Sequence, residues 1–278
     1  MSETVLEVKH LKTTFTTGMG DILAVNDVSF QLKKGEILGI VGESGCGKSV
    51  TSLSVMGLVE APGKIAGGHI SFKGEDILKA SKKRMRQIRG NEIAMIYQDP
   101  IQSLNPVYTI GTQLIECLRL HNKGSRKTMT QIATDYLKRV GLPHADQIMK
   151  AYPHELSGGM CQRVMIAMAM ICEPEVMIAD EPTTALDVTI QAQILELMKE
   201  LNREFQTSII FITHDLGVVA EFCDRVMVMY SGEIVEQSST KTLFKQPKHP
   251  YTKGLIRSVP DVRNKQQTLY SIPGNVPK

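Results

Sequence analysis

Residues 42–49, GESGCGKS, follow the pattern G-x-x-x-x-G-K-S between an apolar run and a segment with helical spacing. Glycines here let backbone N–H groups curl around phosphates, and the Lys48 ammonium neutralises the β- and γ-phosphate oxygens. The Ser49 hydroxyl is a ligand for Mg²⁺. The pattern predicts a nucleoside triphosphate site whose binding residues are Gly42, Glu43, Ser44, Gly45, Cys46, Gly47, Lys48, Ser49 and Val50.

Two neighbouring carboxylates, Asp180 and Glu181, lie at the end of the apolar stretch EVMIAD at 175–180. We expect Asp180 to hold Mg²⁺, directly or through water, and Glu181 to act as general base on the attacking water. Gln98 and His214 end two other apolar stretches, so Gln98 could reach Mg²⁺ and the water, and His214 could sense the γ-phosphate. Taken singly, an acidic pair at a helix N-terminus and a structural histidine are alternatives.

A second glycine-containing motif lies in YPHELSGGMCQRVMIAM at 152–168. Ser157, Gly158 and Gly159 precede an apolar, helix-favouring run, as at an anion-binding helix N-terminus with exposed N–H groups and a positive dipole end. No lysine follows these glycines. The segment therefore predicts a phosphate contact that lacks a lysine of its own.

The elements expected around these motifs alternate between strands and helices, which predicts an α/β core with a largely parallel sheet. Strands are expected at 4–9, 24–32, 37–42, 92–98, 175–180 and 208–214, and hairpins at 67–77 and 225–237. Helices are expected at 49–59, 114–120, 129–142 (with a stop at Gly141), 157–171 and 188–205. The proline-rich last thirty-odd residues predict an extended arm lying on the core, with a frayed end.

Composition limits the class of protein. The 278 residues are 42% hydrophobic and 22% charged, which fits an ordinary globular chain, and the net charge of +3 does not by itself indicate a nucleic-acid partner. The longest apolar run, at 164–172, is far shorter than the about 20 residues of a membrane span. The N-terminus lacks the apolar stretch of a signal peptide, so we expect a cytoplasmic chain. Five cysteines without a C-x-x-C pair suggest neither a disulfide framework nor a zinc site.

In this order, the motifs resemble those of the ATP-binding cassette (ABC) ATPases, over roughly residues 4–240. The matching elements are the Walker A segment GESGCGKS, the Q-loop Gln98, the signature LSGGM, the Walker B segment VMIAD with Glu181, the D-loop ALD and the switch His214. The resemblance implies a P-loop NTPase (RecA-like) core with an antiparallel β subdomain and an inserted α-helical subdomain. It also implies that Phe15 stacks on adenine and that Ser157, Gly158 and Gly159 cover the γ-phosphate bound to a second, head-to-tail cassette. Met160 departs from the commoner glutamine.

A closer resemblance is to the peptide/nickel importer ATPases, carried by YQDPIQSLNP, ADEPTTALDVTIQAQIL, HPYTKGLIRSVP and IPG. Two segments are similar to the sequence of the family's D-type subunit rather than to that of its F-type partner. They are SGGM with QRVMIAMA, and IADEPTTALDVT. The domains implied are a nucleotide-binding domain at 1–245, with a helical subdomain at about 99–175, and a C-terminal extension at 246–278. Family members often continue into four cysteines that hold an iron–sulfur cluster; none is expected here, whether the chain is a short branch or truncated.

The resemblance implies a peripheral ATPase at the cytoplasmic face of the cell membrane, with ATP and Mg²⁺ as cofactors, energising import of oligopeptides or dipeptides. The implied partners are an F-type ATPase in a head-to-tail heterodimer, two integral membrane permeases and, indirectly, an extracytoplasmic solute-binding protein, with no nucleic acid. The segment DPIQSLNPVYTIG after Gln98 would transmit the nucleotide state to the permeases. Two alternatives remain open. Nickel or a metal–chelator complex can be the cargo, or the cassette can be a soluble ATPase acting on DNA or ribosomes, which usually has long heptads or two cassettes.

Overall fold

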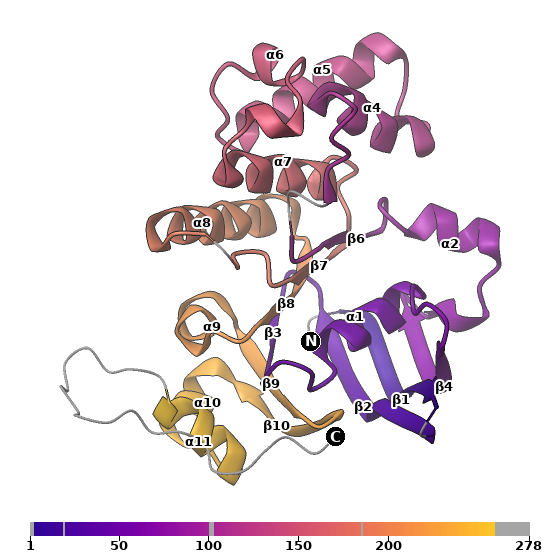
Figure 1. Cartoon of the computed structure of the whole chain (residues 1–278), viewed down its shortest axis with the longest axis vertical. Helices are drawn as coiled ribbons and strands as arrows, with labels where there is room; N and C mark the ends of the chain where they lie inside the picture. Colours follow the sequence, from indigo (N-terminus) through magenta and orange to yellow (C-terminus); the bar gives the residue numbers. More distant parts are fainter. Residues whose placement is uncertain (1–2, 19, 100–102, 185, 259–278) are drawn as a thin grey trace. The chain divides into compact units, whose positions relative to one another are not determined.

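The computed structural model describes residues 3–18, 20–99, 103–184 and 186–258 (Figure 1). The chain groups into two compact units, of which the first is Met1–Lys79 with Ile210–Lys278 and the second is Ala80–Ile209. The helical block expected at about 99–175 lies within the second unit. The domain limits of 1–245 and 246–278 stay predictions.

The first unit contains a four-stranded antiparallel sheet in the order β2-β1-β4-β5. Its strands are β1 (Thr4–Thr17), β2 (Gly20–Lys33), β4 (Gly63–Phe72) and β5 (Glu75–Asp76). Alternation buries one face, which includes Leu6, Val8 and Phe30. The predicted strands at 4–9 and 24–32 and the hairpin at 67–77 are confirmed, although β1 and β2 extend well beyond the predicted limits.

The first unit also holds strands that lie on either side of the buried strand β3. They are β3 (Ile37–Val41), β8 (Ser208–Thr213), β9 (Arg225–Tyr230) and β10 (Glu233–Ser239). β3 has β8 as one neighbour and pairs in parallel with β9 on its other side, and β9 turns back antiparallel into β10. All five residues of β3 are buried, as predicted for a strand covered on both faces.

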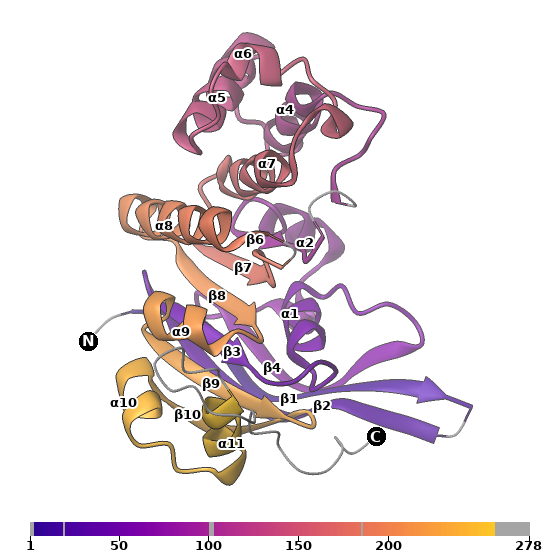
Figure 2. The same ribbon diagram turned by 60° about the vertical axis from the view of Figure 1, so that its left-hand side comes forward.

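Helices follow these strands in the first unit. The helices are α1 (Lys48–Met56), the single 3₁₀ turn η1 (Ile77–Lys79), α9 (Leu216–Phe222), α10 (Thr240–Lys245) and α11 (Pro250–Ser258). α1 begins directly after the phosphate loop and packs on β1 and β2, while α9 packs on β3. α10 lies beside β10 in both views (Figures 1 and 2).

The helix α11 shows that the expectation of an extended arm was wrong for residues 250–258. Pro250 occupies the first helical position, where a missing N–H is not needed and the fixed φ of proline suits the helix. Ahead of the helix, the Glu236 carboxylate accepts the N–H groups of Lys248 and His249 at 2.8 and 2.9 Å. Tyr251 is buried, so side-chain packing outweighs the proline-rich composition. Residues 259–278, including the IPG segment at 272–274, lie outside the described residues.

The second unit combines a parallel strand pair with helices. Strand β6 (Ile93–Ile96) runs parallel to β7 (Val176–Asp180). The helices are α2 (Lys82–Ile88), α4 (Ile110–Leu120), α5 (Arg126–Arg139), α6 (Ala145–Ile148), α7 (Gly158–Met170) and α8 (Val188–Phe205), with the 3₁₀ turn η2 (Pro153–Glu155). α7 packs on β6, and α4, α5 and α8 pack on α7 (Figure 1). The predicted helices and strands of this region are confirmed, whereas α2 and α6 were not predicted.

Local signals fix the ends of two of these helices. The Asp187 carboxylate accepts the N–H of Ile190 at 2.9 Å and caps the start of α8. At the end of α5, Gly141 has φ of +77°, and the N–H of Leu142 donates to the carbonyl of Leu137 at 3.0 Å. This is a Schellman cap, in which glycine takes the left-handed conformation. The predicted stop at Gly141 is confirmed.

No helix formed by the described residues is both long enough and apolar enough to cross a lipid bilayer. All five cysteines carry free thiols, and four of them are buried.

Candidate active site

The phosphate loop of the first unit needs glycine at two positions where the chain runs against other backbone. Gly42 and Gly47 have φ of +156° and +103°. A Cβ on Gly42 would approach the carbonyl oxygen of Met229 to 2.2 Å, and one on Gly47 would approach that of Ala24 to 2.4 Å. The N–H of Gly232, in the β9–β10 turn, donates to the carbonyl of Cys46 at 3.0 Å. The loop is therefore held in one shape by the strands behind it.

Lys48 lies at the start of α1 and is nearly fully buried. Its Nζ donates to the carbonyls of Gly42 and Glu43, both at 2.8 Å, so the ammonium closes the loop from inside. Ser49 is exposed at the same helix N-terminus. A buried lysine at the N-terminus of a helix concentrates positive charge, which suits a phosphate chain.

The other predicted site residues of the first unit are Phe15 and His214. Phe15 on β1 is half-buried, opposite Ile22 of β2 and Gly63 of β4. A Cβ on Gly63 would meet the Phe15 ring at 2.6 Å, so the ring lies close over that glycine. Ile22 is 49% exposed, which leaves an apolar surface beside Phe15. His214 follows β8 and is exposed.

The second unit brings Gln98 and Glu181 together. Gln98 Nε2 donates to Glu181 Oε2 at 3.0 Å, and the hydroxyl of Thr184 donates to the same oxygen at 3.0 Å. Asp180, the last residue of β7, is buried. Glu181 has φ of +48°, an uncommon and strained value for a residue with a side chain. The turn and the two hydrogen bonds fix where the Glu181 carboxylate lies.

The Ser157–Gly159 segment forms a helix N-terminus elsewhere in the second unit. The Ser157 hydroxyl accepts the N–H of Met160 at 3.4 Å and caps α7. Ser157 and Gly158 are exposed, and a Cβ on Gly158 would meet nothing within 4 Å. A Cβ on Gly159 would come within 3.0 Å of Ile190 in α8. Gly159 thus permits close helix packing, whereas Gly158 leaves the helix end open to an outside group.

The predicted site residues are divided between the two units. Phe15, residues 42–50 and His214 belong to the first unit, and Gln98, residues 157–159, Asp180 and Glu181 belong to the second. Ala185 of the D-loop and residues 100–102 lie outside the described residues. Thr184 was not predicted, because nothing in its local sequence marks the hydroxyl as a partner of the Glu181 carboxylate.

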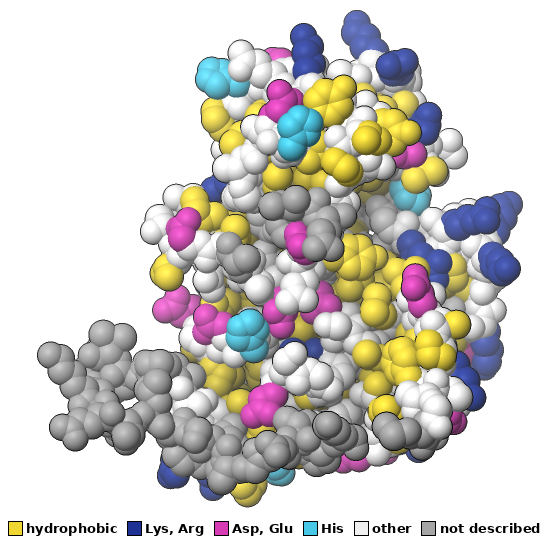
Figure 3. Space-filling view, viewed as in Figure 1, with side chains coloured by type: hydrophobic (Ala, Val, Ile, Leu, Met, Phe, Trp, Pro, Cys, Tyr) yellow, Lys and Arg dark blue, Asp and Glu magenta, His cyan; other side chains and the backbone are white. Residues whose placement is uncertain are grey.

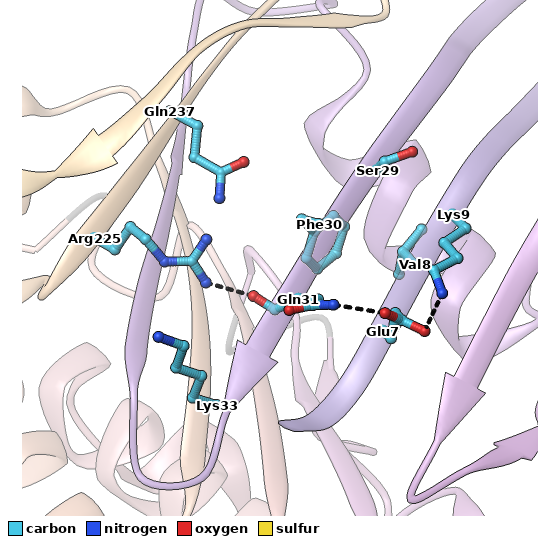
Figure 4. Close-up of a pocket in the computed structure, with 9 residues that line it drawn as sticks. All are labelled: Glu7, Val8, Lys9, Ser29, Phe30, Gln31, Lys33, Arg225 and Gln237. Carbon is cyan, nitrogen blue, oxygen red and sulfur yellow. Dashed lines mark hydrogen bonds and ion pairs between the residues drawn. The ribbon is translucent and has the colours of Figure 1, made fainter. Parts of the chain in front are cut away.

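A separate cavity of about 430 Å³ lies in the first unit between β1, β2, β9 and β10 (Figure 4). Lys9 and Gln31 both bond to the Glu7 carboxylate, at 2.7 and 2.6 Å, and Arg225 donates to the carbonyl of Gln31. Arg225 also forms a two-pronged ion pair with Glu36, at 2.7 and 3.0 Å. These polar groups join the two sheets of the unit, and none of them is a predicted site residue.

Comparison with known proteins identifies the family. The ABC transporter family model matches residues 25–184, and the model for the C-terminal region of oligopeptide/dipeptide transporters matches residues 235–278. The chain is 54% identical to the oligopeptide transport ATP-binding protein AppD of Bacillus subtilis, over 99% of this chain and 84% of AppD. It is also 54% identical to the dipeptide transport ATP-binding protein DppD of the same organism, over 99% of this chain and 82% of DppD. The ATP-binding cassette MJ0796, solved as a dimer in a post-hydrolysis state with ADP and Pi, superposes with a TM-score of 0.76 at 28% identity, covering 84% of this chain and 98% of that one.

The fold and the site define a P-loop NTPase with the predicted fold. Its features are a phosphate loop, two carboxylates where β7 ends, an antiparallel sheet and a helical block. The chain belongs to the ABC transporter family, in the group of its oligopeptide/dipeptide transport ATP-binding proteins. It is an ATP-binding protein and an ATPase, as the resemblance implied. The relatives AppD and DppD agree with the predicted D-type subunit.

Proposed function

We propose that this chain is the ATP-hydrolysing subunit of an importer that takes up oligopeptides or dipeptides through partner membrane subunits. The observation that carries this proposal is similarity along 99% of the chain to AppD and DppD, together with the C-terminal match at 235–278. The C-terminal match is the more specific part, because the phosphate loop and signature occur in ABC ATPases of many kinds.

The phosphate loop and Phe15 bind ATP in this proposal. Backbone N–H groups within residues 42–50, other than that of Glu43, take the phosphates, and Lys48 releases its loop carbonyls to neutralise the β- and γ-oxygens. Phe15 stacks on adenine beside the exposed Ile22. The loop's fixed shape supports this role, because binding then requires little reordering of the backbone.

Mg²⁺ fits the donor atoms that these motifs offer. Ser49 supplies a hydroxyl, Asp180 a carboxylate and Gln98 an amide oxygen, all hard oxygen ligands of the kind that Mg²⁺ takes. When bound, the ion neutralises charge on the β- and γ-phosphates. Gln98 keeps its amide nitrogen on Glu181 through the 3.0 Å bond, so the opposite side of the amide carries the ligand atom.

Hydrolysis is assigned to the Glu181 carboxylate. A water oxygen attacks the γ-phosphorus, the bond to the ADP oxygen breaks, and Glu181 takes the proton from the water. The hydrogen bonds from Gln98 and Thr184 orient this carboxylate. His214, exposed after β8, contacts the γ-phosphate and reports its presence.

The open helix end at Ser157 and Gly158 serves the nucleotide of a second cassette, in our proposal an F-type ATPase paired head-to-tail. Support comes from the exposed N-terminus of α7 and from the dimeric MJ0796 cassette. ATP then joins the two subunits, and hydrolysis lets them separate. The proposed assembly also includes two permeases and, beyond the membrane, a solute-binding protein, with this chain at the cytoplasmic face.

In this proposal, the permeases bind at an apolar cavity in the second unit. It has a volume of about 260 Å³, and the residues that line it include Tyr97, Leu104, Leu120, Met165 and Met168. Tyr97 is 42% and Leu120 69% exposed, so this cavity presents two large apolar side chains to an outside group. Figure 3 shows hydrophobic side chains gathered on the face formed by α4 to α7. Tyr97 precedes Gln98 in the chain, so a permease helix bound here would lie next to Gln98, which bonds to the Glu181 carboxylate.

Transport by the assembled importer tests this function. Proteoliposomes holding this chain with its partner ATPase, permeases and binding protein should accumulate a radiolabelled oligopeptide or dipeptide when ATP is supplied. The Lys48→Ala variant of this chain is the matched control and should accumulate none. Uptake of ⁶³Ni²⁺ without peptide uptake would show that the cargo is nickel and not a peptide. Peptide uptake that does not depend on ATP would contradict the proposal that this chain energises import.

Cys46 gives a direct test of nucleotide binding at the loop. Burial raises the pKa of its thiol, although Lys48 lies nearby, so little thiolate is present at neutral pH and alkylation should be slow. The rate should rise with pH as thiolate forms, and ATP with Mg²⁺ should reduce it because phosphates cover the loop. The labelling rate is measured by mass spectrometry of the peptide containing Cys46. Equal rates with and without nucleotide contradict this placement of ATP.

A further inference from the structure

The phosphate loop is bonded on its outer side by a residue from the C-terminal region. The N–H of Glu43 donates to the hydroxyl oxygen of Tyr251 in α11, at 3.1 Å. The carbonyl of the same residue accepts from Lys48 Nζ at 2.8 Å. Both polar backbone groups of Glu43 are therefore engaged, one by the loop's own lysine and one by a side chain 208 residues away.

Tyr251 is firmly held in this place. It is 8% exposed, and its ring lies 4.5 Å from that of Tyr230, at the end of β9, with the planes tilted by 51°. Its N–H donates to His249 Nδ1 at 3.2 Å, and His249 itself is bonded to Glu236 of β10. Burial raises the pKa of the Tyr251 hydroxyl to about 12, so it is protonated at neutral pH. The hydroxyl thus meets the loop at a fixed point.

We propose that Tyr251 is a positioning residue of the phosphate loop, through which the C-terminal region sets the affinity of this chain for ATP. The bond fixes Glu43, and with it the turn from Gly42 into the residues whose N–H groups take phosphate. Without the hydroxyl, the Glu43 peptide can rotate, and ATP binding must then restore its orientation. The inference rests on the proposed phosphate role of residues 42–50.

A purely structural role for Tyr251, as an anchor of α11, makes different predictions. The ring contact with Tyr230 remains in Tyr251→Phe, which removes only the hydroxyl. If Tyr251 only anchors α11, the Tyr251→Phe variant should behave as the wild type, or should have a lower melting temperature with the same nucleotide affinity. Tyr230→Phe is the matched control, because it removes the neighbouring hydroxyl, which makes no hydrogen bond to the residues that the structure describes.

The experiment compares the full chain with its Tyr251→Phe, Tyr230→Phe and Lys48→Ala variants. Titration with a fluorescent ATP analogue gives the Kd, and alkylation in the absence of nucleotide gives the labelling rate of each cysteine. Tyr251→Phe should weaken ATP binding by about two- to tenfold, the effect of one neutral hydrogen bond. It should also speed labelling of Cys46 while buried Cys161 and Cys223 react as in the wild type. Tyr230→Phe should change neither quantity.

Two outcomes overturn the inference. One is wild-type ATP affinity and Cys46 labelling in Tyr251→Phe, and the other is equally faster labelling of all buried cysteines, which indicates general loosening. Lys48→Ala separates this failure from that of the proposed function. If Lys48→Ala binds ATP as tightly as the wild type, the phosphate role of the loop is wrong. If Lys48→Ala loses binding and Tyr251→Phe does not, only the role of Tyr251 is wrong.

Discussion

Glu181→Gln is expected to reduce ATP turnover by about 10²- to 10⁴-fold, the usual contribution of a general base. Glutamine has nearly the same shape and can still bond to Gln98 and Thr184, but it cannot take a proton from water. ATP affinity should stay close to that of the wild type, because Glu181 acts on the water rather than on the nucleotide. Phosphate release by the reconstituted importer, alongside nucleotide titration, measures both quantities.

Thr184→Val is the matched control for this prediction. It removes one donor to the Glu181 carboxylate and leaves the carboxylate itself, so turnover should fall only by about two- to tenfold. Near-normal turnover in Glu181→Gln would contradict the assignment of Glu181 as the general base. Equal losses in the two variants would mean that the turn after β7, rather than the carboxylate, limits the reaction.

Gly158→Asp is expected to leave ATP binding by this chain intact and to reduce turnover at the partner's site by about 10²- to 10³-fold. Nothing lies within 4 Å of a Cβ at this position, and an acidic residue is favourable in the first turn of a helix, so the chain should fold normally. The added carboxylate would face the γ-phosphate bound to the partner and repel it, with the loss typical of removing one charge-stabilising donor. Single-turnover hydrolysis, with the partner as the only subunit able to bind ATP, measures the effect.

Ser125→Asp is the control for added charge. Ser125 caps α5 as Ser157 caps α7, and aspartate is an equally good cap, so this variant should hydrolyse ATP as the wild type does. Gly158→Asp would contradict the assignment if it weakened ATP binding by this chain and left the partner's turnover unchanged.

Elements with a strong local signal were predictable from the sequence. Helix α8 has Asp187 as its cap and a regular apolar stripe, and its predicted limits of 188–205 agree with the structure. Helix α2 was missed because its sequence, KKRMRQI, buries only Ile88 and shows no apolar period. The ends of β1 and β2 at residues 10–17 and 20–23 were missed because their sequences show no clear alternation, and it is pairing with neighbouring strands that makes them extended.

The candidate site was predictable in its residue types but not in its detailed geometry. Spacing identified Gln98 and Glu181, and their hydrogen bond brings together residues 83 positions apart, which no local pattern can predict. The left-handed backbone of Glu181 is equally hidden, because a glutamate carries no signal for positive φ. The contact of Tyr251 with the phosphate loop was not predicted for a third reason. It belongs to a proline-rich stretch expected to be extended, and its contact with Glu43 exists only because that stretch is helical.

The central claim is that this chain holds two half-sites, with residues 42–50 binding its own ATP and residues 157–159 covering the ATP of a partner cassette. Orthovanadate trapped with ADP occupies the position of the γ-phosphate, and ultraviolet irradiation then cleaves the backbone beside it. In the complete importer, this chain should be cleaved both near 42–50 and near 157–159, whereas the chain without its partner should be cleaved only near 42–50. An importer in which vanadate inhibits hydrolysis but this chain is never cleaved near 157–159 would contradict the account.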